Sequence, residues 1–129
     1  MINKKILIVD DDLNIVELLE VNLKACGYET ISASDGHKAL DKINTENPDL
    51  IILDVMMPGM DGWEVCKIIR DHHGVSNIKI LFLTGKDKNK DKLIGIDVFK
   101  ADKYITKPFD LDFLIDEVAK LLSGQNYKR

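Results

Sequence analysis

The hydrophobic positions of this chain change their spacing repeatedly from one segment to the next. Continuous runs of apolar side chains cover residues 6–9, 50–53 and 80–83, within the predicted strands 5–9, 50–53 and 78–83, and residues 28–33 and 103–106 carry shorter or weaker runs. A continuous apolar run of this length is typical of a strand that is buried on both faces of a parallel sheet. The pattern therefore predicts five strands.

Between these runs, apolar residues recur at intervals of three and four, which predicts amphipathic helices. Gly27 is placed to stop the first helix, and the second is bounded by Asp35 as its cap and by Pro48 after its end. The clearest apolar stripe lies on residues 109–122. The predicted helices are residues 13–25, the stretch between Asp35 and Pro48, a helix carrying Val65, Ile68 and Ile69, the segment from Lys86 to Lys100, and residues 109–122.

Strands that alternate with helices are typical of right-handed βαβ units, so the order of elements predicts an α/β fold. We expect a doubly wound sheet of five parallel strands with five helices covering both faces. In such folds ligands bind beyond the carboxyl ends of the strands, near the point where the strand order reverses. The residues that follow each strand are therefore the first place to look for a functional site.

Polar residues do follow four of the five predicted strands. Asp10-Asp11-Asp12 come directly after the first, Asp54 after the third, Thr84 after the fourth and Lys107 after the fifth. Because the carboxyl ends of parallel strands meet at one edge of the sheet, these side chains are expected to lie close together. Carboxylates, a hydroxyl and an ammonium together suggest a site for a metal ion and a phosphoryl group.

The carboxylates carry most of this interpretation. Three acids in a row repel one another, and a cation would stabilise them; carboxylate oxygens suit Mg²⁺ in particular. One of the three, Asp12, is also expected to cap the following helix. Asp54 ends a buried run, where a carboxylate can act as a nucleophile and form an aspartyl phosphate. The alternative is that Asp54 only initiates a turn, but Pro58 lies four residues further on.

Thr84 and Lys107 are weaker signals when each is taken alone, because Thr is common in strands and most lysines are solvated. A hydroxyl can donate a hydrogen bond to a phosphoryl oxygen, and an ammonium group is a mobile positive charge that suits phosphate. Lys107 stands immediately before Pro108. A Lys-Pro bond has a modest intrinsic cis probability, and a cis bond here would help to aim the ammonium into the site.

Composition narrows the function classes. A chain of 129 residues suits one domain, and its net charge of −4 gives no general attraction to nucleic acid or to anionic membranes. No apolar stretch approaches the length of a membrane span, and no signal-peptide pattern precedes the first strand. Cys26 and Cys66 lack partners at metal-ligand spacing, so we expect reduced thiols and a cytoplasmic location.

Together, the motifs resemble the receiver domain of bacterial two-component response regulators, which has a flavodoxin-like sheet of strand order 2-1-3-4-5. The resemblance covers about residues 4–122, and it predicts a receiver domain over 1–124 followed by a polar tail over 125–129. The motifs match the family in both composition and spacing. The four motifs are Ile6-Leu7-Ile8-Val9-Asp10-Asp11-Asp12, the run from Asp49 to Gly62, Leu83-Thr84-Gly85, and the run from Tyr104 to Phe109.

This resemblance implies a role for each site residue. Asp54 would be the phosphoacceptor, and Mg²⁺ would be held by Asp10, Asp11, Asp54 and the backbone carbonyl of Met56. Lys107 would bind a phosphoryl oxygen. Thr84 would move toward the phosphoryl group and Tyr104 would rotate inward with it. The lifetime of the phosphoryl group would depend on Met56 and Lys86, which lie two positions past Asp54 and Thr84.

The resemblance also implies partners. The phosphoryl group would come from a sensor histidine kinase or a histidine phosphotransfer protein. The output would be a downstream protein or a fused domain, contacted through the face built by the fourth helix, fifth strand and fifth helix. A second copy of the chain is a further possible partner, in a homodimer formed through the same face. Direct binding to nucleic acid or membrane is not expected. Lys100 departs from the Gly usual in the family, and Gly95 falls within the expected fourth helix, so this face is expected to be unusual.

Two other functions fit parts of the pattern. A Mg²⁺-dependent phosphohydrolase would use the same aspartyl phosphate, but such enzymes commonly need a second acid or base beside the nucleophile. Met56, two residues after Asp54, cannot transfer protons, which favours a switch that catalyses only its own phosphotransfer and dephosphorylation. A flavin-binding protein would need a phosphate loop after the first strand. The three acids there would instead repel a phosphate.

Overall fold

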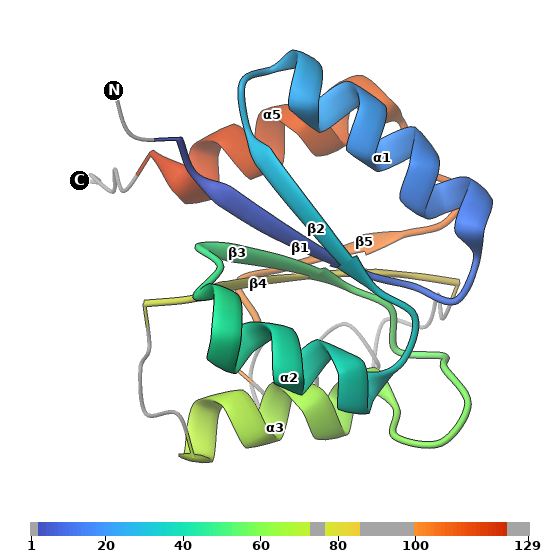
Figure 1. Cartoon of the computed structure of the whole chain (residues 1–129). Helices are drawn as coiled ribbons and strands as arrows, with labels where there is room; N and C mark the ends of the chain where they lie inside the picture. Colours follow the sequence, from blue (N-terminus) through green and yellow to red (C-terminus); the bar gives the residue numbers. More distant parts are fainter. Residues whose placement is uncertain (1–2, 73–76, 86–99, 124–129) are drawn as a thin grey trace.

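The computed structural model describes residues 3–72, 77–85 and 100–123, which form one parallel sheet with helices on both faces. The strands lie in the order β2-β1-β3-β4-β5 (Figure 1). The predicted doubly wound α/β fold and its strand order are therefore confirmed. The strands are β1 (Lys5–Val9), β2 (Glu29–Ala33), β3 (Leu50–Leu53), β4 (Lys79–Thr84) and β5 (Lys103–Thr106). The helices are α1 (Leu13–Ala25), α2 (Gly36–Glu46), α3 (Gly62–His72) and α5 (Leu111–Leu122).

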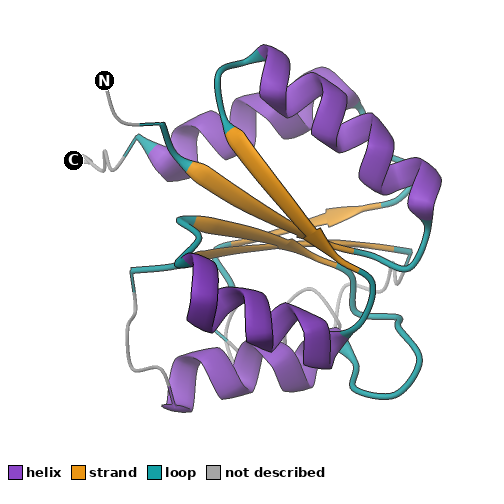
Figure 2. Cartoon of the chain, in the orientation of Figure 1, coloured by secondary structure: helices purple, strands orange, loops and turns teal. Residues whose placement is uncertain are grey.

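The helices form one layer above the sheet and one below it, as Figure 2 shows. Alternate side chains of each strand point to opposite faces, so every central strand contributes to two separate apolar cores. Leu7 and Ile51 pack against α2 and α3, whereas Ile6 and Ile52 pack against α1 and α5. This two-sided burial explains why the central strands read as continuous apolar runs in the sequence.

The helix ends follow from local side-chain chemistry. Asp12, Asp35 and Asp110 are N-caps, and the carboxylate of each accepts a hydrogen bond from a backbone N–H in the first turn of its helix. The predicted caps at Asp12 and Asp35 are confirmed. The predicted start of the last helix at residue 109 is wrong by two positions, because the Asp110 cap places the first helical residue at Leu111.

The fourth helix was expected from Lys86 to Lys100. Residues 86–99, with Gly95 among them, lie outside the described residues. The structure therefore describes four helices within its three ranges. Lys100 is described, and it has a positive φ of 63°. A lysine thus occupies the left-handed conformation that Gly adopts more readily. In the part of the chain that the structure covers, no helix is both long enough and apolar enough to span a membrane.

Candidate functional site

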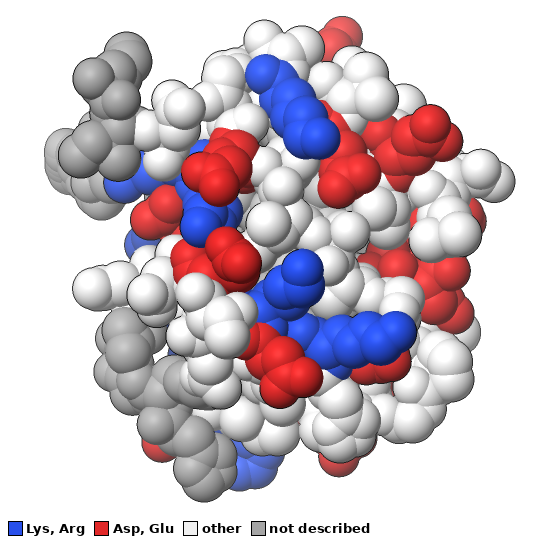
Figure 3. All heavy atoms as spheres, in the orientation of Figure 1, with Lys and Arg blue, Asp and Glu red and all other residues white. Residues whose placement is uncertain are grey.

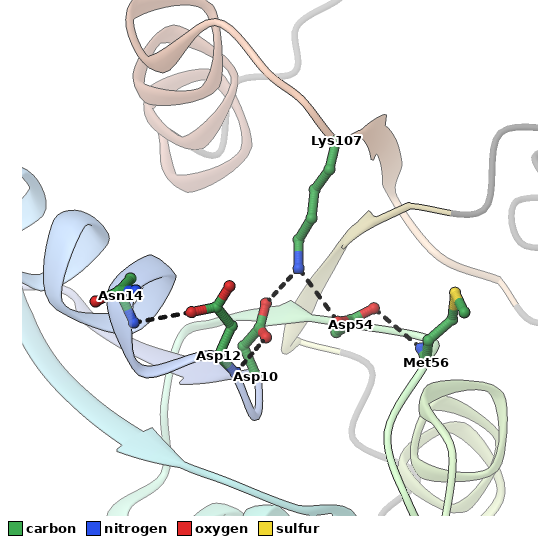
Figure 4. A network of polar contacts seen from close by, with 6 residues as sticks. All are labelled: Asp10, Asp12, Asn14, Asp54, Met56 and Lys107. Atoms are coloured by element: carbon green, nitrogen blue, oxygen red, sulfur yellow. Dashed lines mark hydrogen bonds and ion pairs between the residues drawn. The ribbon is translucent and has the colours of Figure 1, made fainter.

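The polar residues that follow the strands meet at the carboxyl edge of the sheet, as predicted. Asp10 follows β1, Asp54 follows β3, Thr84 ends β4 and Lys107 follows β5. Figure 4 shows Lys107 reaching down between the two aspartates, with its Nζ directed at a carboxylate oxygen of each. The sequence separations among these residues reach 97 positions, so only the parallel sheet brings them together.

Asp10 is almost completely buried, with 3% of its surface exposed. Its Oδ2 accepts a hydrogen bond from Lys107 Nζ at 2.7 Å, and its Oδ1 accepts one from the backbone N–H of Asp12 at 2.9 Å. Burial raises the pKa of the Asp10 carboxyl, although Lys107 and the Asp12 N–H both act to lower it. The ionised form of Asp10 is therefore held in the site at a cost in free energy.

Asp54 is the central carboxylate of the site and is 5% exposed. Its Oδ2 lies 3.2 Å from Lys107 Nζ, and its Oδ1 accepts a hydrogen bond from the backbone N–H of Met56 at 2.9 Å. Its own backbone N–H donates to the carbonyl of Val9 at 3.0 Å, which continues the β1–β3 pairing up to the site. The carboxylate is thus held firmly at the point where the strand becomes a loop.

Lys107 is the cation that compensates the two buried aspartates. Burial acts to lower the pKa of its ammonium, but the hydrogen bond and charge of Asp10 and the charge of Asp54 outweigh this, and the pKa is raised. Lys107 therefore remains protonated at neutral pH. Its backbone N–H donates to the carbonyl of Thr84 at 2.8 Å, and its bond to Pro108 is cis, as the sequence suggested.

Thr84 carries a polar atom that lacks a partner among the described residues. The residue is fully buried, and its Oγ1 makes no hydrogen bond with any described residue. Leaving a buried hydroxyl unpaired costs about 1–3 kcal/mol, and an unpaired group in a native structure calls for an explanation. A ligand oxygen bound beside Asp54 would supply the missing acceptor.

Asp11 completes a cluster of three carboxylates. One oxygen from each of Asp10, Asp11 and Asp54 can be chosen so that all three lie within 4.8 Å of one another. Asp11 is exposed, so the cluster opens to solvent on its side. Asp12 takes no part, because its Oδ1 accepts from the backbone N–H of Asn14 at the start of α1. All-oxygen ligands with access to water suit Mg²⁺.

Two predicted residues lie apart from this polar cluster. Tyr104 is on β5 but is 7% exposed and belongs to the apolar core between the sheet and α3. The side chain of Met56 is 58% exposed, at the rim of the site. Lys86 lies outside the described residues. Sequence reasoning missed Gly62, whose missing Cβ leaves room for the carbonyl oxygen of Asp54 and for Val55 Cα. Its position in the Asp-Gly pair pointed only to a turn.

With this geometry established, comparison with known proteins identifies the family. The family model of the response regulator receiver domain matches residues 6–119. The chain belongs to this family. It is also 54% identical over 107 residues to the alkaline phosphatase synthesis transcriptional regulatory protein PhoP of Bacillus subtilis. That match covers 83% of this chain and 43% of PhoP, so the receiver domain spans less than half the length of this curated relative.

Solved receiver structures share the fold closely. The response regulator TrrA from Thermotoga maritima, solved in complex with Mg²⁺-BeF, is 42% identical with a TM-score of 0.80, and the match covers 92% of this chain and 98% of that one. The Francisella response regulator 1452 receiver domain is 36% identical with a TM-score of 0.87, and the match covers 94% of this chain and 98% of that one. The resemblance seen in the sequence motifs is thus confirmed.

Proposed function

We propose that this receiver domain is a signalling switch controlled by phosphorylation of Asp54. The observation that carries the proposal is the placement of Asp54. Its carboxylate is buried beside two further aspartates and lies 3.2 Å from the ammonium of Lys107. Three carboxylates around one ammonium leave net negative charge, which a divalent cation and then a phosphoryl group bound to it would offset.

The proposed reaction forms one bond and breaks one. An oxygen of Asp54 attacks the phosphorus of the donor, and the bond from phosphorus to the donor nitrogen or oxygen breaks, with the electron pair leaving on the donor. Lys107, protonated because its pKa is raised, places its positive charge beside the phosphoryl oxygens. The unpaired hydroxyl of Thr84 then donates to one of these oxygens, which satisfies a buried donor.

The described residues fit Mg²⁺ as the resident metal. Asp10, Asp11 and Asp54 supply carboxylate oxygens, and the backbone carbonyl of Met56 is the fourth protein ligand that the family resemblance implies. When bound, Mg²⁺ reduces the repulsion between the carboxylates and an incoming phosphoryl group. The aspartates hold the cation, and Lys107 remains available for the phosphoryl oxygens.

A sensor histidine kinase or a histidine phosphotransfer protein is the proposed phosphodonor. Beside Lys107 lies an apolar hollow of about 430 Å³, lined by Ile15, Leu18, Pro108, Phe109 and Leu111. Leu18 of α1 is 41% exposed there. An amphipathic helix seated in this hollow would bring a phosphorylated side chain to the carboxyl edge of the sheet. A cytoplasmic location belongs to the same proposal.

The output surface is proposed to involve Thr84, Tyr104 and the faces of β5 and α5. Thr84 contacts the phosphoryl group, and Tyr104 is on the adjacent strand, so a change at one is passed to the other. The receiver would then act on a downstream protein or a fused output domain. A homodimer would use the same face. The fourth helix expected in that face falls on residues 86–99, which the structure does not describe. On the face drawn in Figure 3, basic and acidic side chains are interspersed, which gives no support to direct binding of nucleic acid there.

A phosphohydrolase that acts on external substrates is the less favoured function. In the described part of the site, Met56 occupies the position beside Asp54 where such an enzyme would need an acid or base. We therefore propose that the only chemistry is transfer of the phosphoryl group to and from Asp54.

Intact-mass measurement with acetyl phosphate and Mg²⁺ tests the function. The wild-type chain should gain one phosphoryl group, and Asp54→Asn should gain none. Asp61→Asn is a matched control, because Asp61 is on the same loop outside the site and an Asn retains its cap on Glu64. An adduct of unchanged yield on Asp54→Asn would contradict the assignment.

A further inference from the structure

Three aromatic side chains pack together between the sheet and α3. The ring of Trp63 lies 4.8 Å from that of Phe82 and 6.2 Å from that of Tyr104, measured between ring centroids. The rings of Phe82 and Tyr104 are 6.0 Å apart. The planes of Trp63 and Tyr104 are inclined by only 27°, so these two rings are stacked. These three residues are called the aromatic cluster below.

Trp63 connects this cluster to the loop that follows Asp54. It is the second residue of α3, and the backbone N–H of its neighbour Gly62 donates to the carbonyl of Val55 at 3.0 Å. A Cβ on Gly62 would collide with the carbonyl oxygen of Asp54. The first turn of α3 is therefore in direct contact with the backbone of the phosphoacceptor. A shift of that backbone toward α3 would move Gly62, and Trp63 follows it in the chain.

The opposite side of the cluster is built from the strands that carry the rest of the site. Phe82 and Tyr104 are paired in the register of β4 and β5. Phe82 is two residues before Thr84 and so points to the same face of the sheet. Tyr104 is three residues before Lys107 and is 7% exposed. Trp63 thus packs against the one residue of β5 that is proposed to change position.

We infer that Trp63 is a positioning residue that holds Tyr104 in its buried position and links the Asp54 loop to β5. This inference rests on the proposed function, and it adds a route that does not pass through the hydroxyl of Thr84. Aromatic pairs in this geometry contribute enough beyond their burial to shift an equilibrium by roughly two- to tenfold. The stack therefore favours the buried position of Tyr104 before any phosphoryl group is present.

The stack also makes the coupling reciprocal, as linkage requires. If Trp63 favours the buried Tyr104, then displacement of Tyr104 favours a different position for Trp63 and the loop behind it. Replacement of the indole ring by an aliphatic side chain should weaken this link without altering any polar residue of the site. Replacement by Phe, which keeps a ring, should preserve part of it.

The test measures the position of Tyr104 directly by ¹⁹F NMR of the full chain labelled with 3-fluorotyrosine. The chain has three tyrosines, and Tyr104→Phe identifies the Tyr104 signal. In Trp63→Leu without phosphodonor, the ratio of buried to exposed Tyr104 should fall roughly two- to tenfold, and in Trp63→Phe it should fall less. Tyr28→Leu is the control, because Tyr28 packs on the opposite face of the sheet. An unchanged ratio in Trp63→Leu would overturn the inference.

A companion measurement leaves position 63 intact and so does not depend on the folding of Trp63→Leu. Trp63 is the sole tryptophan, and its fluorescence should shift in Tyr104→Leu relative to wild type. Addition of Mg²⁺ and beryllofluoride should change that fluorescence in wild type and much less in Tyr104→Leu. Equal and measurable responses in both proteins would contradict the coupling. Failure of the proposed function would give a different result. Wild type would then form no beryllofluoride adduct, but the ratio of buried to exposed Tyr104 without phosphodonor would still depend on Trp63.

Discussion

The guanidinium of Arg70 holds the backbone carbonyl of Lys100 with two hydrogen bonds, from Nε at 3.0 Å and from Nη2 at 2.8 Å. The same side chain donates to the carbonyl of Ile78 and to the carboxylate of Asp102, which in turn accepts from the backbone N–H of Ile80. The last turn of α3 is thus tied to the beginnings of β4 and β5. This explains how Lys100 is held in a left-handed conformation that costs a non-Gly residue free energy.

Replacement of Lys100 by Gly should therefore stabilise the receiver domain. Gly adopts a φ of 63° readily, and we expect a gain of about 0.5–1 kcal/mol in the free energy of unfolding. Urea denaturation measures this difference. Lys100→Val is the opposite control, since a β-branched side chain is strongly disfavoured at positive φ. A loss of stability in Lys100→Gly would show that the lysine side chain makes a compensating contact.

The sheet and the polar side chains at its edge were predictable from sequence because both depend on local pattern. A strand buried on both faces must be apolar throughout, so β1, β3 and β4 stand out, and whatever follows them lies at the binding edge. Arg70 could not be predicted in the same way. Two of its acceptors are backbone carbonyls, one of them 30 residues away, and a carbonyl leaves no trace in the identity of its residue. Its third acceptor, the carboxylate of Asp102, is 32 residues away.

The contacts between side chains within the site could not be predicted from the sequence either. The motifs predicted that Asp10 and Lys107 share a site, but the 2.7 Å pair between them depends on how β1 and β5 are spaced by the intervening strands. That no described residue pairs with the Thr84 hydroxyl could be seen only in the structure. Trp63 packs against the core from the start of α3. Its stacking on Tyr104 required the register of β5.

Asp10→Asn should stabilise the protein at neutral pH. The pKa of Asp10 is raised by burial, so the folded state binds its proton more tightly than the unfolded state does. The contribution of Asp10 to stability is therefore present at low pH and is lost as the pH rises through the folded pKa. An Asn avoids this loss and keeps the acceptor for the N–H of Asp12, so the free energy of unfolding at pH 7 should be higher in Asp10→Asn than in wild type.

Thermal unfolding of both proteins from pH 7 downward measures the effect. The difference between Asp10→Asn and wild type should shrink as wild-type Asp10 becomes protonated. Asp41→Asn, on the exposed side of α2, controls for a change in net charge alone. A stability difference between the two proteins that grew toward low pH would contradict this prediction.

Leu18→Asp should reduce phosphotransfer from a protein donor while leaving a small donor unaffected. Leu18 lines the apolar hollow beside Lys107, and a carboxylate there would have to lose its water when a partner helix packs on it. Transfer rates from an autophosphorylated histidine kinase that phosphorylates the wild-type chain should fall at least tenfold, which corresponds to about 1.4 kcal/mol. Rates with acetyl phosphate should not change.

Val21→Asp provides the matched control for this experiment. Val21 is 61% exposed on the same helix and does not line the hollow. It introduces the same charge and should leave both rates near those of wild type. Equal losses in Leu18→Asp and Val21→Asp would indicate a charge effect and would count against docking in the hollow.

Gly62→Ala should destabilise the fold through the Asp54 loop. A Cβ at this position would lie 2.8 Å from Val55 Cα and would also collide with the carbonyl of Asp54, and backbone atoms cannot move aside as a flexible side chain can. Overpacking of this kind costs about 1–3 kcal/mol. Gly85→Ala is the control, because a Cβ there meets nothing within 4 Å. Similar stabilities for the two variants in urea denaturation would refute the steric argument.

Met56→Asn should shorten the lifetime of the phosphorylated state. The backbone N–H of Met56 donates to Asp54 Oδ1, so its side chain begins beside Asp54, and it is 58% exposed at the rim of the site. A thioether side chain cannot orient water for attack on phosphorus, whereas the amide of Asn both donates and accepts hydrogen bonds. Wild type is thus expected to lose its phosphoryl group slowly, and Met56→Asn several-fold faster.

Intact-mass measurement after removal of acetyl phosphate follows the decay of the phosphorylated state. Val21→Asn is the control, because it replaces an exposed apolar residue outside the site. Decay in Met56→Asn that is no faster than in wild type would show that Met56 does not limit the access of water to the phosphoryl group.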